Sequence, residues 1–219
     1  MIINFDLAAT KATETLIRYK IATAPIDPLP VLKKYPGVIV VPFAEAAHKV
    51  GMERESLLDM MGNESRAAVT TVQQIAGETR YIVVYNQRMQ FVLLQRALAR
   101  ELGHIVLGHD GTRTVEVRMA EAYAFALHFL CPRALIRTLQ ESPYPLTVET
   151  LGNVTGCFGG CLSRMNQLPG ANVPPELNRI LKNQFAEYIK DFLRYQPVLS
   201  AEDRSPVADF GTYMDNYAE

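Results

Sequence analysis

The middle of the chain limits the fold most, because a strand pattern is followed there by two long helical patterns. Residues 79–86, TRYIVVYN, are dense in aromatic and β-branched side chains and predict a buried strand. Apolar residues then recur at helical spacing, which predicts helices over about 89–107 and 114–130. Both patterns are apolar around most of the helix, so we expect both helices to cross a core.

The flanking sequence predicts further short elements. Asp6 is a candidate N-cap for a helix over 6–22. The other predicted elements are a short helix at 29–35, strands at 37–41, 67–75 and 78–85, and helices at 56–61, 133–140, 147–153 and 175–195. Together they predict an α+β fold in which a small mixed sheet packs on the long helix over 89–107, with extra C-terminal helices.

Composition excludes several classes of protein. The 219 residues are 48% apolar, enough for a sizeable core. Lys plus Arg total 22 against 23 for Asp plus Glu, a balance that argues against a dedicated binder of the DNA backbone. No apolar run approaches the roughly 20 residues of a membrane span, and the N-terminal residues lack the apolar region of a signal peptide. We therefore expect a cytoplasmic protein that does not associate with membranes.

The cysteines do not predict a disulfide framework. Cys131, Cys157 and Cys161 are too few, and odd in number. The spacing of Cys157 and Cys161 could hold a metal on a helix, but the intervening glycines weaken any helix there. We interpret both as free thiols.

The segment Arg100-Glu101-Leu102-Gly103-His104 and the later Glu121 indicate the chemistry of the site. In metallopeptidases a His-Glu-x-x-His helix places two imidazoles on one face, where they hold zinc, and the glutamate activates the zinc-bound water. A third ligand, often a glutamate, comes from another helix. Here Glu101, His104 and Glu121 occupy three of these positions, and Arg100 occupies that of the first histidine.

These motifs resemble the ImmA/IrrE family of bacterial and phage-borne metallopeptidases. ALARELGHIVLGH followed by EAYAFALHFLCP is similar to the family's AHELGH helix and EAxxFAxxLLxP helix. The resemblance implies a zincin-like fold and a zinc endopeptidase that cleaves a helix-turn-helix repressor. It implies Glu101 as general base, with His104 and Glu121 as metal ligands. It also suggests a domain over 1–140 and a helical extension over 141–197. The acidic composition of residues 198–219 predicts a partly disordered tail.

Arg100 departs from this family pattern. A guanidinium stays protonated and offers no lone pair to a cation, so the motif supplies two ligands where a catalytic zinc usually has three. His109 would reach the site only if the chain folded back, and His128 lies about 10 Å further along its helix than Glu121. We therefore predict a site without zinc, in which Arg100 pairs with Glu121 and also contacts Glu101.

Three functions follow from these observations. The first is a degenerate peptidase that keeps its groove and binds a protein partner, such as a repressor or an antitoxin of a mobile element. The second is an active zinc endopeptidase with a rearranged ligand set. The third is a DNA-associated regulator that uses the helix-turn-helix-like segment 146–167, although that segment is rich in glycine and offers only Arg164 for contacts. The first is our prediction, with direct nucleic-acid binding disfavoured.

Overall fold

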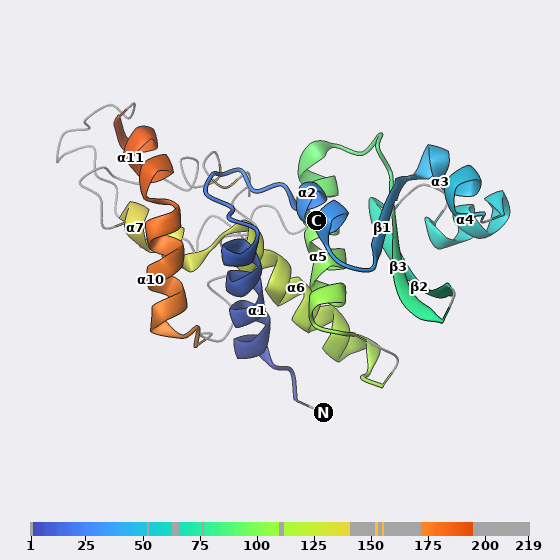
Figure 1. The fold of residues 1–219 in the computed structure, drawn as a ribbon, viewed down its shortest axis with the longest axis horizontal. Helices are drawn as coiled ribbons and strands as arrows, with labels where there is room; N and C mark the ends of the chain where they lie inside the picture. The colour runs from blue at the N-terminus through green and yellow to red at the C-terminus, as the bar shows by residue number, and fades with distance from the viewer. Residues whose placement is uncertain are drawn as a thin grey trace, which may run out of the picture. The chain divides into compact units, whose positions relative to one another are not determined.

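A computed structural model of the chain describes residues 2–51, 53–62, 66–75, 77–109, 112–140, 152, 155 and 172–194. The chain divides into two compact units (Figure 1). Residues 27–122 form the first unit, and residues 2–26 belong with those from 123 onward in the second. The predictions for the tail, for Cys157 and Cys161 and, apart from residues 152 and 155, for the segment 146–167 lie outside the described residues.

The first unit contains a three-stranded mixed sheet. Its strands are β1 (Val38–Pro42), β2 (Ala68–Ile75) and β3 (Glu78–Tyr85), in the order β1-β3-β2. β1 runs parallel to β3, whereas β2 and β3 form an antiparallel hairpin. The hairpin turns at Gly77, whose φ of 81° is a left-handed conformation that glycine adopts without strain. The predicted α+β class and small mixed sheet are confirmed.

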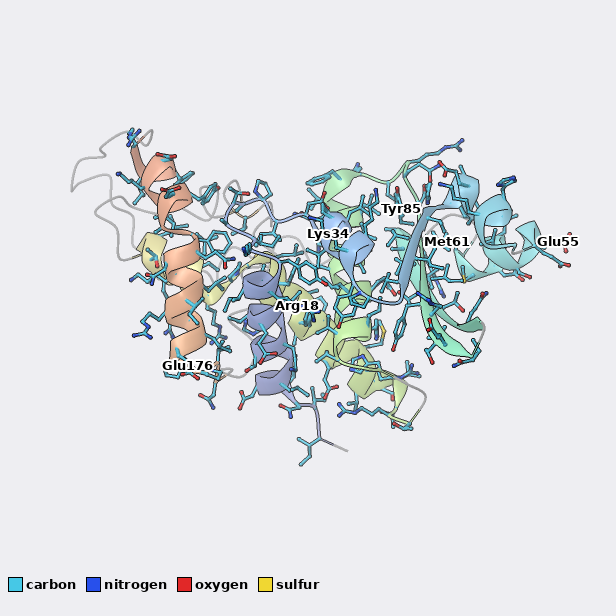
Figure 2. All side chains as sticks on the ribbon, viewed as in Figure 1. Arg18, Lys34, Glu55, Met61, Tyr85 and Glu176 are labelled. Atoms are coloured by element: carbon cyan, nitrogen blue, oxygen red, sulfur yellow. The ribbon has the colours of Figure 1, made fainter. Side chains whose placement is uncertain are left out.

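Helices cover both faces of this sheet (Figure 1). Ile82 and Val84 on β3 pack with Leu57 and Met61 beneath α3 (Phe43–Val50) and α4 (Arg54–Met60). Figure 2 labels Met61, which follows the last residue of α4. On the other face, α5 (Phe91–Val106) packs against β2 and β3, and α2 (Pro28–Lys34) packs against β1 and α5. Because residues alternate along a strand, Val83 lies on the α5 face, and it is also fully buried. The sheet therefore holds α5 in a fixed position.

The second unit is helical. It comprises α1 (Phe5–Arg18), α7 (Arg133–Gln140), α10 (Pro175–Gln184), α11 (Ala186–Arg194) and the C-terminal half of α6 (Val115–Leu130). α10 packs against α1 and α7, and the Gln184 Nε2 group donates hydrogen bonds to the carbonyl oxygens of Leu16 and Ile21 at 3.0 and 2.6 Å. None of the helices in the described part of the chain is long and apolar enough to cross a bilayer.

Three local predictions require correction. Asn4, not Asp6, caps α1: its side chain accepts a hydrogen bond from the Leu7 amide at 2.9 Å, whereas Asp6 accepts one from the Asn172 amide at 2.8 Å. The predicted helix over 175–195 is two helices that meet at Phe185. α3 was not predicted, because nothing in its short sequence marks a start beyond Pro42.

Candidate functional site

The helix α5 presents Arg100, Glu101 and His104 along one groove of the first unit. Glu101 and His104 are separated by three positions and therefore lie on neighbouring turns of one helix face. The groove has a volume of about 600 Å³ and is bordered by β2, by α5 and by the first turns of α6. Glu101 is 7% exposed, and Arg100 is the more accessible of the two.

The end of α5 brings His109 beside His104. Gly108 has a φ of 62°, and this left-handed residue turns the chain back on itself after the helix. The His109 amide then donates to the carbonyl oxygen of His104 at 3.0 Å. The two imidazoles meet at their Nδ1 atoms, 2.9 Å apart. The expectation that His109 is badly placed is thus wrong, because Gly108 supplies the reversal that an ordinary residue would resist.

Glu121, at 0% exposure, is bound by donors from His109 and Arg113. Its Oε2 atom lies 3.0 Å from Nε2 of His109 and 2.5 Å from Nη1 of Arg113. The sequence predicted that Arg100 would neutralise Glu121. That pairing is wrong: Arg113, in the connection between α5 and α6, has this role, and Arg100 contacts Glu101 at 3.7 Å. A buried, ionised carboxylate requires a cationic partner. Here the connection between α5 and α6 supplies that partner, Arg113.

Burial dominates the electrostatics of the groove. Burial raises the pKa of Glu101, and contacts with Thr70 and Arg100 offset this only in part. Burial, followed by the nearby His109, Arg100 and Arg118, lowers the pKa of His104 to about 4. Burial also lowers the pKa of His109, against the opposing effect of Glu121. Both histidines are therefore neutral near pH 7.

The contacts assign the hydrogen-bond directions of the two imidazoles. An ionised Glu121 can only accept, so Nε2 of His109 carries the proton and donates to it. In a neutral His109 the Nδ1 atom then holds a lone pair, which accepts from Nδ1 of His104. The Nε2 atom of His104 is left with a lone pair. The array runs from Arg113 through Glu121 and His109 to His104.

These residues do not fit the zinc site that the resemblance implies. Arg100 has no lone pair to give, Oε2 of Glu121 is engaged by Arg113 and His109, and Nδ1 of His104 is engaged by His109. A catalytic zinc usually has three protein ligands, and in this arrangement the candidate ligands His104, His109 and Glu121 bind one another and Arg113. Among the described residues, no group of three or more His, Cys, Asp or Glu side chains is arranged to hold a metal ion.

His128 lies on the same helix as Glu121 but belongs to the second unit. It is 3% exposed, as expected for a core histidine, and burial together with Arg133 lowers its pKa to about 4. Its Nε2 atom is buried without a hydrogen-bond partner among the described residues. Cys131 is a buried free thiol.

Sequence reasoning located Glu101, His104 and Glu121, set His109 aside and did not consider Arg113. His109 had a signal, the glycine that precedes it, which was not interpreted as a reversal. Arg113 had no such signal in the sequence, because the spacing of a single arginine in a connection does not relate it to a buried carboxylate.

No family model, curated protein or solved structure matches this chain. The resemblance to the ImmA/IrrE family therefore rests on the two helical motifs alone.

Proposed function

We propose that this protein is a peptidase-like scaffold that binds an extended segment of a protein partner without cutting it. The observation that carries the proposal is the occupation of Glu121 by Arg113 and His109. In the resembling family the equivalent carboxylate is a zinc ligand. Here a guanidinium supplies the neutralising positive charge, but a guanidinium cannot activate a water molecule as a metal ion does.

The surroundings of Glu101 also support binding without hydrolysis. A general base must draw a proton from water, and water attacks a peptide efficiently only when its own pKa is lowered, as zinc does. The cationic neighbour of Glu101 is Arg100, at 3.7 Å. An arginine beside the carboxylate does not replace the Lewis acid. We therefore expect the groove to bind a peptide without hydrolysing it.

The border of the groove supports an extended peptide as the ligand. β2 is an edge strand of the described sheet, with backbone groups on its outer side for an added strand. Three exposed apolar side chains, Val72, Val115 and Met119, line the same groove at 52%, 58% and 42% exposure. An apolar border beside a strand edge that no described strand covers is typical of a surface that binds another polypeptide. A repressor or antitoxin is the partner that the family resemblance suggests.

The test combines hydrogen exchange of the protein's amides with mass spectrometry of the added peptide. The probe is an eight-residue peptide of alternating serine and valine with a central glutamate. On its addition the β2 amides should exchange more slowly, and mass spectrometry should find the peptide intact after overnight incubation, with or without added zinc. Val72→Glu should abolish the protection. Ile180→Glu, on the exposed surface of α10 in the other unit, is the matched control and should not. Unchanged exchange on β2 would contradict the proposal.

An active zinc endopeptidase with a rearranged ligand set is the second candidate, and the position of His109 favours it. This imidazole lies within hydrogen-bond distance of both His104 and Glu121, so it could become the missing ligand if Arg113 moved away. Cleavage of the probe peptide in the presence of zinc, and its loss in a His109→Ala variant, would establish this function instead.

A further inference from the structure

We infer that the groove beside β2 selects a segment that carries an acidic side chain, whose carboxylate binds between Arg100 and Arg118. This inference rests on the proposed function and names the chemistry of the partner. The substitution that removes the first metal ligand also introduces a positive charge into the same groove. An anionic group on the ligand is the natural complement of that charge.

The charges that line the groove are predominantly positive. Arg66, Arg100 and Arg118 border it, against the carboxylate of Glu101. Arginine stays protonated at every relevant pH, so the excess of positive charge does not depend on the histidines. The other nearby carboxylate, Glu121, is bound by Arg113 and His109. The groove is therefore electropositive although the whole chain has a net charge of -1.

Arg118 has an unused donor in this groove. Its Nε atom is buried and has no hydrogen-bond partner among the described residues. A buried donor without an acceptor is unfavourable, so an incoming acceptor would be bound favourably. The Arg100 guanidinium is held only weakly by Glu101, because the distance from its Nε atom to Oε1 of Glu101 is 3.7 Å, which is longer than a normal hydrogen bond. Both guanidiniums can thus turn donors towards a ligand.

The surroundings favour a carboxylate on a peptide over the phosphates of a nucleic acid. Val72, Val115 and Met119 border the same groove, and an apolar border suits the neighbouring side chains of a protein segment. In a strand added to β2, every second side chain points to the same face. One acidic residue could therefore face Arg100 and Arg118 while apolar residues contact the border.

Fluorescence anisotropy with two labelled peptides tests this selection. One peptide is the alternating serine and valine probe with its central glutamate, and the other carries glutamine there. We expect the glutamate peptide to bind about tenfold more tightly, as loss of one charge-assisted hydrogen bond implies. Arg118→Gln and, separately, Arg100→Gln should each reduce this preference to less than about threefold. The second variant covers the case in which the partly buried Arg118 is needed for folding.

The control lies in the other unit. Arg179 borders a basic groove between α7 and α10, and Arg179→Gln removes an equal charge far along the sequence from β2. It should leave the tenfold preference intact, and a loss of preference in this variant would overturn the inference. If both peptides bound equally and Val72→Glu still abolished their binding, the inference would be overturned but the proposed function would stand. Failure of both peptides to bind would overturn the proposed function as well. Displacement of the peptide by 1 mM inorganic phosphate would point to a general anion site instead.

Discussion

The Glu121 carboxylate is fully buried, and the identity of its partners decides what the site can do. Arg113 and His109 both reach its Oε2 atom, and His109 in turn holds His104. A metal ion would have to displace these contacts. Each of these is a close polar contact in a buried setting. A metal ion that displaced them would therefore bind less favourably than one that entered a site whose ligands had no other partners.

Removal of Arg113 tests the strength of this pairing. Arg113→Ala removes the guanidinium that neutralises the buried Glu121, so we expect the free energy of unfolding to fall by about 2 kcal/mol. Glu121→Gln in the same background should recover most of that loss, because the buried charge is then gone. Chemical denaturation of the single and double variants measures the coupling. Arg80→Ala, which breaks an exposed pair with Glu78, should cost less than about 0.5 kcal/mol. Additive effects of the first two substitutions would contradict the pairing.

At the scale of the element, the end of α5 assembles the site. The helix carries Glu101 and His104, the left-handed Gly108 reverses the chain, and the reversal places His109. The sheet was predicted closely because β-branched residues mark β1 and β3. The long helices α5 and α6 were predicted because apolar residues recur at helical spacing along the whole of each.

Features that depend on tertiary contacts were not predictable in this way. α3 is short and lacks a capping side chain, so its sequence carries no start signal. The break at Phe185 follows no proline or glycine, and this phenylalanine is completely buried. The roles of His109 and Arg113 depend on where a connection turns, and helical periodicity gives no information about connections.

Gly108 offers a test at this scale. Gly108→Ala forces a side chain into a left-handed conformation and should lower the free energy of unfolding by about 1 kcal/mol. Gly108→Asn should cost less, because asparagine tolerates this conformation better. A Cβ at this position would meet no atom within 4 Å, so strain and not a clash is the expected cause. Equal stability of the alanine and asparagine variants would contradict the required left-handed turn.

For the whole molecule, the histidines govern the response to acid. The native state keeps His128 neutral down to about pH 4, whereas in the unfolded chain it gains a proton near pH 6.5. Between these values the unfolded state binds more protons, so the free energy of unfolding decreases as the pH falls. His104 acts in the same direction, and Glu101, with its raised pKa, acts in the opposite one.

His128→Leu isolates one share of this response. Between pH 6.5 and pH 5 the parent should lose about 2 kcal/mol more of its free energy of unfolding than the variant does. Denaturant titrations at the two pH values measure the difference. His48→Gln, at an exposed histidine, is the matched control. A His128→Leu variant with the same pH dependence as the parent would show that His128 titrates normally.

The most direct test of the central claim is the zinc content of the purified protein, measured by elemental mass spectrometry after incubation with zinc and gel filtration. The account predicts far less than one zinc per chain in the parent, because Arg100 replaces a ligand and Arg113 and His109 occupy Glu121. It predicts that Arg100→His combined with Arg113→Ala raises the content towards one. About one zinc per chain in the unmodified protein would contradict the account and favour the active peptidase.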